Sequence, residues 1–256
     1  MEVWVHRGRA SPKQLGNSLR NFLHISRLEI TGFETDICFT LDQKIIIYHP
    51  GSTEPDLTQM LSTDINNSIF NVMYLEEFLD LIGTMPDLEY SLDIKQNSED
   101  LVMRTIQAII AKNLQNRIYL TAFQKKLPRL GIESDASLLT LTKAICPNIR
   151  THMIVIWPFN LPKLVRTYHP DAISIGWLLE PKIIRLISKS LFKSVAQMRN
   201  LKKQIRETQN MGVKVWAGIF NNPDEMIYSA QLGIDGIITD EPKILIDLIK
   251  KQKILV

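Results

Sequence analysis

The sequence predicts an α/β protein with the architecture of a (β/α)8 TIM barrel. Its 256 residues are about the length of one such barrel. Short runs rich in β-branched and aromatic residues alternate along the chain with segments of helical periodicity, which is typical of βαβ units around a parallel sheet. Eight such runs favour a closed barrel over an open sheet. No low-complexity linker interrupts the chain, so we expect a single domain over residues 1–256.

Each expected strand is a short apolar run. In chain order the runs are 2–6, 32–39, 87–95, 116–123, 151–157, 171–177, 213–220 and 235–240. A further run, residues 43–49, predicts a hairpin-like excursion that ends at His49. Two intervening helices carry start signals, at Ser98-Glu99-Asp100 and at Pro223-Asp224-Glu225, and Gly233 ends the second.

The connection between the sixth and seventh strands, residues 178–212, is unusually long. Four apolar residues recur at every fourth position in it, with four basic residues between them: Ile183, Ile187, Leu191 and Val195, and Lys182, Arg185, Lys189 and Lys193. We expect the apolar stripe to pack against the barrel and the basic residues to be solvated. The alternative is a lid or interfacial helix that brings anionic or lipid-like substrate to the site.

Composition excludes several classes of protein. The 30 basic and 27 acidic residues are interleaved and give a net charge of only +3, which argues against nucleic-acid binding. Two cysteines, Cys38 and Cys146, are too few for a disulfide scaffold and have no metal-ligand spacing. We find no signal peptide and no apolar run long enough to span a membrane. We therefore expect a cytoplasmic protein that makes at most weak contact with a membrane surface.

Polar side chains gather at the carboxyl ends of the first three expected strands, where barrel enzymes place their chemistry. His6-Arg7 ends the first strand, Glu34-x-Asp36 lies in the second, and Asp93-x-Lys95 ends the third. Residues two apart in a strand share one face, so these side chains are expected to converge at one mouth together with His49. Carboxylates suit Mg²⁺ or Ca²⁺, cations suit a phosphate, and paired histidines suit proton transfer.

The order of these motifs resembles the glycerophosphodiester phosphodiesterase family from His6 to Pro242. The segments that carry the resemblance are HRG (6–8), NS (17–18), GFETDICFTLDQKIIIYH (32–49), LDIK (92–95) and GIDGIITDEP (233–242). The resemblance implies a metal-dependent (β/α)8 barrel of lipid and glycerol metabolism that hydrolyses deacylated phospholipids to glycerol 3-phosphate and an alcohol. It also implies roles for single residues. Glu34, Asp36 and Asp93 would hold a divalent metal, Mg²⁺ or Ca²⁺; His6 and His49 would be the acid–base pair; Arg7 and Lys95 would bind phosphate.

The chain departs from the family pattern at several positions. Asp93 stands where the family has a glutamate, Pro50 follows His49 where the family has an aspartate, and Gly16 replaces the glutamate of Pro-Glu-Asn. The family's tryptophan on the seventh strand falls nearest Gly218. Trp216, two residues earlier on the same strand face, is expected to replace it as a wall of the substrate pocket, although deeper in the barrel.

Other interpretations stay open at this point. Glu34 and Asp36 would serve only as ion-pair partners of Arg7 and Lys95 if no metal binds. A metal-independent lipase of the phosphatidylinositol-specific phospholipase C type uses paired histidines and an arginine, but the three carboxylates count against it. A degenerate barrel would bind phosphodiesters without turnover, and the departures at Asp93, Gly16 and Pro50 favour it. The sequence leaves the head group, the native metal and the oligomeric state open.

Overall fold

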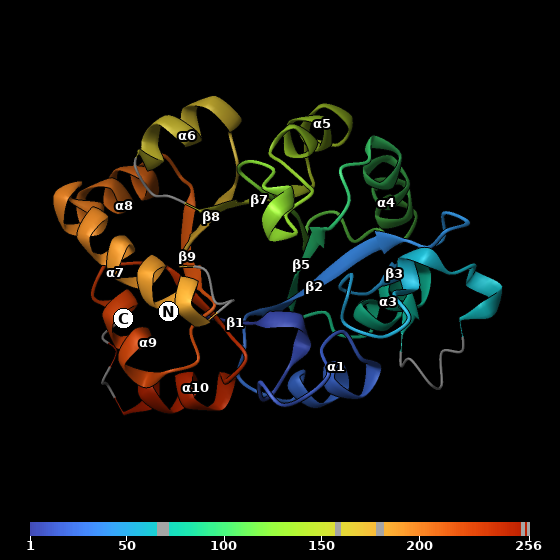
Figure 1. Ribbon diagram of the computed structural model, residues 1–256, viewed down its shortest axis with the longest axis horizontal. Helices are drawn as coiled ribbons and strands as arrows, with labels where there is room; N and C mark the ends of the chain where they lie inside the picture. Colours follow the sequence, from blue (N-terminus) through green and yellow to red (C-terminus); the bar gives the residue numbers. More distant parts are fainter. Residues whose placement is uncertain (66–71, 157–159, 178–181, 252–253, 255–256) are drawn as a thin grey trace.

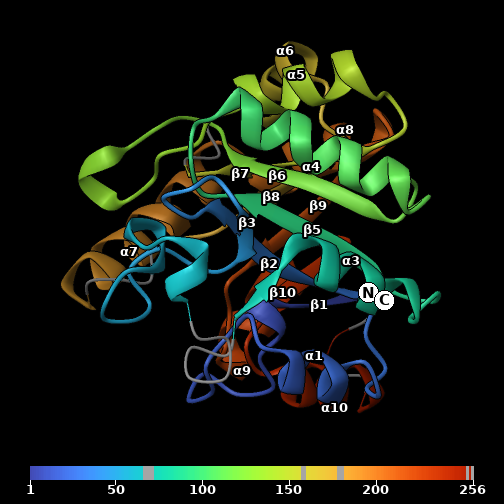
Figure 2. The ribbon, with the colours of Figure 1, turned by 90° about the vertical axis from the view of Figure 1, so that its right-hand side faces the viewer.

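Eight parallel strands close into a barrel in the computed structural model, which describes residues 1–65, 72–156, 160–177, 182–251 and 254. The strands follow each other around the ring in the order β1-β10-β9-β8-β7-β6-β5-β2, and pairing of β1 with β2 closes it. Helices surround the strands (Figure 1). In the side view α1 and α10 lie below the strands, and α4 and α5 lie above them (Figure 2). The predicted (β/α)8 barrel is confirmed.

Every predicted strand run overlaps one strand of the barrel. The barrel strands are β1 (Glu2–Val5), β2 (Gly32–Phe39), β5 (Glu89–Ile94), β6 (Ile118–Phe123), β7 (Arg150–Val155), β8 (Ala172–Ile175), β9 (Lys214–Gly218) and β10 (Gly236–Thr239). The predicted excursion is β3 (Ile45–Ile47), which pairs antiparallel with β2 and with β4 (Met73–Tyr74). The last predicted residue of the fifth run, Trp157, lies outside the described residues.

The helices cover the outside of the barrel. Their bounds are α1 (Leu19–Ile25), α3 (Leu75–Gly83), α4 (Glu99–Ala111), α5 (Ser137–Ile145), α6 (Leu161–Tyr168), α7 (Lys182–Met198), α8 (Leu201–Asn210), α9 (Pro223–Ala230) and α10 (Pro242–Lys250). Short 3-10 turns are η1 (His6–Gly8), η2 (Leu57–Gln59), η3 (Ser62–Asp64) and η4 (Pro128–Leu130). Both predicted helix starts are confirmed: the Ser98 side chain caps α4, and Pro223 opens α9 after an Asn222 cap. None of the described helices is long and apolar enough to cross a membrane.

Aromatic side chains fill the inside of the barrel below its mouth. Trp4 and Trp216 lie with ring centroids 4.5 Å apart, and the ring of Tyr119 packs edge-on against both. Both indole N–H groups donate to Glu2 Oε2, at 3.0 Å from Trp4 and 2.8 Å from Trp216. Because Glu2 begins β1, these bonds fix the aromatic layer toward the amino-terminal end of the barrel. The layer forms a closed floor under the strand ends.

Helix α7 buries only part of the apolar stripe that the sequence predicts. Ile187 is 63% exposed and Leu191 is 44% exposed, whereas Phe192 is 2% exposed and packs edge-on against Trp177. The Lys189 side chain is 31% exposed and forms an ion pair, with its Nζ 2.6 Å from Glu225 Oε1. The expectation was therefore wrong for Ile187 and Leu191. It is confirmed for Val195, which is 4% exposed, and for Lys193, which is exposed; the side chain of Ile183 lies outside the described residues. A spacing of four residues does not fix how a helix is rotated, and the contacts of Phe192 and Lys189 set that rotation here.

The unfolding of two neighbouring variants tests this packing. Phe192→Ala removes a buried aromatic ring and should lower the free energy of unfolding by about 3–5 kcal/mol. Leu191→Ala removes a largely exposed side chain and should lower it by less than about 1 kcal/mol. Urea titrations of both variants provide the measurement. A larger loss for Leu191→Ala than for Phe192→Ala would contradict the observed rotation of α7.

Candidate active site

The turn after β1 places His6 and Arg7 at the mouth of the barrel. Arg7 (φ 50°) and Gly8 (φ 62°) both adopt left-handed backbone conformations within η1. A Cβ on Gly8 would lie 2.4 Å from the ring of Phe22, so both the backbone angle and the available space require glycine. The Arg7 carbonyl accepts a hydrogen bond of 2.8 Å from the backbone N–H of Asn17, which fixes the turn. The sequence His-Arg-Gly thus presents two side chains from one short turn.

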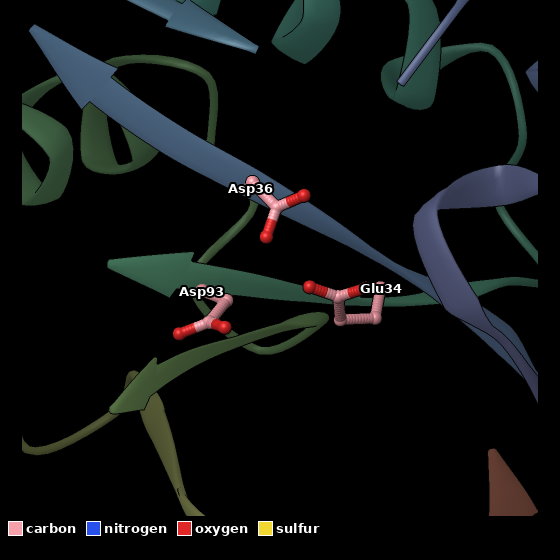
Figure 3. A group of neighbouring side chains, drawn as sticks. All are labelled: Glu34, Asp36 and Asp93. Carbon is pink, nitrogen blue, oxygen red and sulfur yellow. The ribbon is translucent and has the colours of Figure 1, made fainter. Parts of the chain in front are cut away.

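Three carboxylates lie together on the neighbouring strands β2 and β5. The strand register pairs Asp36 directly with Asp93, and Glu34 precedes Asp36 by two residues on the same face. One oxygen of each carboxylate lies within 4.8 Å of the other two (Figure 3), and all three side chains are buried. The predicted convergence of these residues is what period-2 alternation in adjacent strands produces.

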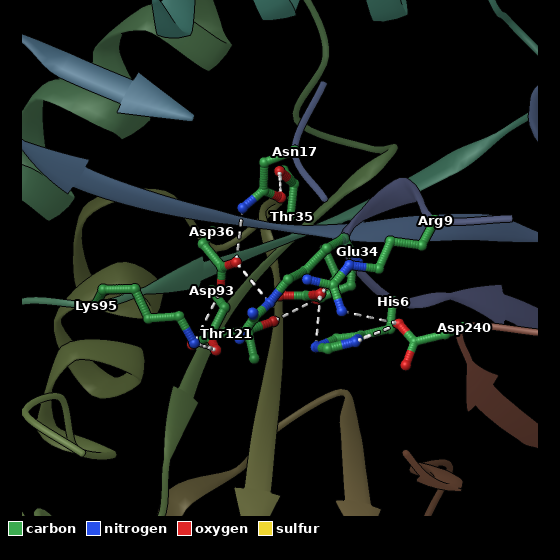
Figure 4. A network of polar contacts seen from close by, with 12 residues as sticks. His6, Arg9, Asn17, Glu34, Thr35, Asp36, Asp93, Lys95, Thr121 and Asp240 are labelled. Atoms are coloured by element: carbon green, nitrogen blue, oxygen red, sulfur yellow. Dashed lines mark hydrogen bonds and ion pairs between the residues drawn. The ribbon is translucent and has the colours of Figure 1, made fainter. Parts of the chain in front are cut away.

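Two cations and two polar groups neutralise this cluster in part. Lys95 Nζ lies 2.8 Å from Asp36 Oδ1 and also bonds Asp93. Arg7 Nε forms an ion pair of 3.0 Å with Asp36 Oδ2, and the Asn17 amide donates to the same oxygen at 2.8 Å. The backbone N–H of Arg7 donates to Glu34 Oε2 at 3.0 Å. Figure 4 shows how these groups surround the carboxylates.

The charge balance of the cluster fits a divalent cation. Burial raises the pKa of Glu34 well above its ordinary value, and it also raises the pKa of Asp93. Burial acts in the same direction on Asp36, but Arg7 and Lys95 outweigh it and hold the pKa of that carboxyl far below its usual range. Asp93 Oδ1 is buried and has no hydrogen-bond partner among the described residues. Hard oxygen ligands with uncompensated negative charge are what Mg²⁺ and Ca²⁺ bind.

His6 lies between this cluster and a fourth carboxylate, Asp240. Its Nδ1 is 2.8 Å from Asp240 Oδ1, and its Nε2 is 4.0 Å from Glu34 Oε2. The Asn221 amide donates to the second oxygen of Asp240 at 2.8 Å, and the backbone N–H of Asp240 donates to Asn221 Oδ1. Burial, followed by the charge of Arg7, lowers the pKa of His6. A carboxylate at Nδ1 keeps the proton on that nitrogen, so the neutral ring presents an unprotonated Nε2 toward the cluster.

His49 follows β3 and lines a pocket at the same mouth. Arg7, Arg9, Gly16, Asn17 and Tyr48 line the pocket with it. Burial lowers the pKa of His49 to about 4, so its ring is neutral at pH 7. No side chain among the described residues donates to or accepts from the ring of His49, in contrast to His6 with its Asp240 partner. The structure therefore brings seven of the eight predicted site residues to one mouth.

Comparison with known proteins identifies the family. The model of the glycerophosphoryl diester phosphodiesterase family matches residues 6–244. The chain belongs to this family. It is 24% identical over 252 residues to probable glycerophosphodiester phosphodiesterase 2 of Mycobacterium tuberculosis, covering 96% of this chain and 89% of that protein. Members of the family are phosphoric diester hydrolases, and this chain is one of them.

Solved structures share the fold. A glycerophosphodiester phosphodiesterase from Parabacteroides distasonis matches with a TM-score of 0.74 at 15% identity, covering 98% of this chain and 97% of that one. A phosphodiesterase from Oleispira antarctica, solved in complex with the product sn-glycerol-3-phosphate, matches with a TM-score of 0.70 at 16% identity, covering 98% and 97%.

Trp216 is the predicted site residue that the structure does not bring to the mouth. Its side chain is fully buried in the aromatic layer, where its indole bonds Glu2 and its ring packs on His152. A position two residues earlier on β9 keeps the same face but moves the side chain about one layer deeper into the barrel. The Trp216 ring therefore lies in the floor below the site. It does not line the pocket at the mouth of the barrel.

Sequence reasoning missed three residues of the site: Arg9, Asn221 and Asp240. Asp240 lies in the quoted segment GIDGIITDEP, and Asn221 lies two residues before the start of α9. A signal was available, because both follow the carboxyl ends of strands β9 and β10. Strand β10 pairs with β1 in the barrel, which brings Asp240 beside His6 although 234 residues separate them.

The buried His152 should make stability depend on pH. Its side chain is 1% exposed, its Nδ1 lies 3.1 Å from the Thr121 hydroxyl, and burial lowers its pKa to about 3 from 6.5. The unfolded chain binds a proton below pH 6.5 and the folded chain does not, so this contribution is complete above pH 6.5 and is lost as the pH falls toward 3. By pH 5 the loss is about 2 kcal/mol.

His152→Gln measures this contribution. Urea unfolding at pH 7 and at pH 5 should show that the variant loses about 2 kcal/mol less than the parent chain between the two values. All other titrating groups are shared by the two proteins and cancel in the comparison. Equal losses would mean that His152 is protonated in the folded protein at pH 5.

Proposed function

We propose that the chain hydrolyses glycerophosphodiesters to glycerol 3-phosphate and an alcohol, with a divalent cation and two histidines. The observation that carries the proposal is the buried cluster of Glu34, Asp36 and Asp93 with His6 Nε2 facing it. Family membership supports the reaction class. The bound product in the Oleispira antarctica phosphodiesterase, sn-glycerol-3-phosphate, supports the substrate class.

The three carboxylates would hold the cation. When bound, Mg²⁺ or Ca²⁺ supplies a positive charge that polarises a phosphoryl oxygen and lowers the pKa of the attacking oxygen. Asp93 is one methylene shorter than the family's glutamate, but its carboxylate still lies within the 4.8 Å group. This geometry counts against the metal-independent phospholipase C-type reading, which needs no such cluster.

Arg7 and Lys95 would bind the phosphate. Both form ion pairs with Asp36 in the structure, with Arg7 Nε at 3.0 Å and Lys95 Nζ at 2.8 Å from its carboxylate oxygens. Both cations border the carboxylates, so a phosphodiester at the cluster lies within reach of their N–H groups. Guanidinium and ammonium groups stabilise the negative charge that grows on phosphoryl oxygens as the bond to the leaving alcohol breaks.

The two histidines would move the protons. Asp240 keeps the proton of His6 on Nδ1, so Nε2 is free to accept a proton from the attacking water or substrate hydroxyl. His49 would then protonate the leaving alcohol. Its pKa of about 4 is low for this task, and an anionic phosphate beside the ring raises it by favouring the charged form.

The remaining features of the proposal follow from the same site. The partner is a small-molecule phosphodiester, and one domain over residues 1–256 carries the whole reaction. The free cysteines Cys38 and Cys146 support a reducing, cytoplasmic setting. A degenerate barrel without turnover is the second candidate, favoured by Gly16 and Pro50.

A product assay tests the reaction. Glycerophosphocholine should yield glycerol 3-phosphate with Mg²⁺ or Ca²⁺ and none in EDTA. His6→Ala and His49→Ala should each lower kcat by about 10²–10⁴, because each removes one of the proton transfers. Full activity in EDTA would remove the metal from the mechanism, and absence of product with every metal would favour the degenerate barrel.

A metal titration tests the role of Asp93. Asp93→Asn keeps the size of the side chain but removes its charge. The metal concentration for half-maximal activity should therefore rise by at least about tenfold. Asp87→Asn is the matched control, because Asp87 is an exposed aspartate just before the same strand. The same metal requirement in Asp93→Asn and Asp87→Asn would exclude Asp93 as a ligand.

A further inference from the structure

Arg9 places a second arginine side chain, besides Arg7, in the wall of the pocket. Its side chain is 20% exposed and lines the pocket together with Arg7 and His49. Its Nε is buried and has no hydrogen-bond partner among the described residues. The nearest carboxylate is Asp240, whose Oδ1 lies 3.8 Å from the NH1 nitrogen of Arg9, beyond hydrogen-bond length.

Gly16 makes the space that Arg9 occupies. A Cβ at this position would lie 2.9 Å from Arg9 Nε and 2.7 Å from Arg7 Cβ. The backbone of Gly16 is not in the left-handed region, so the neighbouring arginines rather than its backbone angles exclude a larger residue. Position 16 is also where the chain lacks the glutamate of the family pattern. The guanidinium of Arg9 therefore occupies space that a larger side chain at position 16 would need.

The other charges at the mouth are matched more closely than that of Arg9. Arg7 and Lys95 each form an ion pair of 3.0 Å or less with Asp36. The two oxygens of Asp240 are engaged at 2.8 Å by His6 and Asn221. Arg9 has five N–H donors and no side-chain hydrogen bond among the described residues. The buried Nε–H of Arg9 has no acceptor among the described residues, and a buried donor without an acceptor is unfavourable unless a ligand supplies one.

Arg9 forms no ion pair with the three carboxylates of the cluster. Its ion-pair partner among the described residues is Asp240, and Figure 4 marks this contact with a dashed line. A phosphodiester held by Arg7 and Lys95 therefore leaves the guanidinium of Arg9 available to another part of the substrate.

We propose that Arg9 forms a second anion-binding position, which takes a carboxylate or phosphate group carried by the head group of the substrate. This inference rests on the proposed function and names the substrate class of that same site: glycerophosphodiesters with an anionic head group. A guanidinium matches both groups because it donates two parallel hydrogen bonds to paired oxygens.

Two substrates that differ by one carboxylate test the proposal. Glycerophosphoserine carries that group and glycerophosphoethanolamine lacks it, whereas both carry the ammonium. The parent chain should favour the serine diester in kcat/KM, and Arg9→Gln should lower this preference about 10- to 100-fold, the range for hydrogen bonds to charged groups. Arg9→Lys should keep part of it, because the charge remains and the paired donors are lost. Arg20→Gln, at an exposed arginine outside this pocket, is the matched control and should keep all of it.

A second substrate pair separates the two sources of the anion. The second pair is glycerophosphoglycerol with and without a terminal phosphate. The ratio of their kcat/KM values measures the preference for a phosphate, as the first pair measures the preference for a carboxylate. A preference that depends on Arg9 in either pair supports the proposal and identifies the anionic group that Arg9 binds. Equal kcat/KM within both pairs, or a preference that Arg9→Gln and Arg9→Lys leave intact, overturns it.

A binding measurement without turnover tests the anion position at Arg9 separately from the proposed hydrolysis. Calorimetry in EDTA gives the Kd of each diester for the parent chain and for Arg9→Gln. Tighter binding of the serine diester that is lost in Arg9→Gln supports the anion position, even where neither diester is hydrolysed and the proposed function fails. Equal Kd values for the two diesters overturn the anion position, even where both are hydrolysed.

Discussion

The burial of three carboxylates at one barrel mouth is the constraint that the surrounding structure satisfies. Placing Glu34, Asp36 and Asp93 within 4.8 Å of one another out of water is unfavourable unless positive charge and hydrogen bonds compensate. Lys95, the residue directly after β5, supplies one charge. Arg7 supplies another from η1, together with its backbone N–H. The left-handed turn at Arg7 and Gly8 is thus tied to the electrostatics of the site, because it aims both groups of one residue at the cluster.

The aromatic layer closes off the inside of the barrel beneath the carboxylates. Trp4, Tyr119 and Trp216 pack against one another there, and Glu2 accepts hydrogen bonds from both indole N–H groups from below. The pocket lined by Arg7, Arg9 and His49 lies at the opposite side of the cluster, toward the carboxyl ends of the strands. The low effective polarity of that floor also keeps His152 neutral and strengthens every charge interaction above it.

The sequence predicts the parts of this account that depend on local periodicity. Alternation along β2 and β5 was sufficient to place Glu34, Asp36, Asp93 and Lys95 on one face, and the resemblance supplied their roles. The contact between Asp240 and His6 was missed, because it depends on the pairing of the first and last barrel strands and not on any local pattern. The sequence did not predict how deep in the barrel Trp216 lies along its strand. It also did not predict the rotation of α7 about its axis, which leaves Leu191 exposed. Both depend on which neighbours pack best, and spacing does not encode that.

Binding of Mn²⁺ tests whether Glu34, Asp36 and Asp93 form one metal site. Electron paramagnetic resonance of free Mn²⁺ during a titration counts the ions that each chain binds. We expect one bound ion per chain for the parent protein and none for Glu34→Gln/Asp36→Asn, with both proteins folded by circular dichroism. Unchanged binding in the double variant, or no binding to the parent protein, would contradict this expectation.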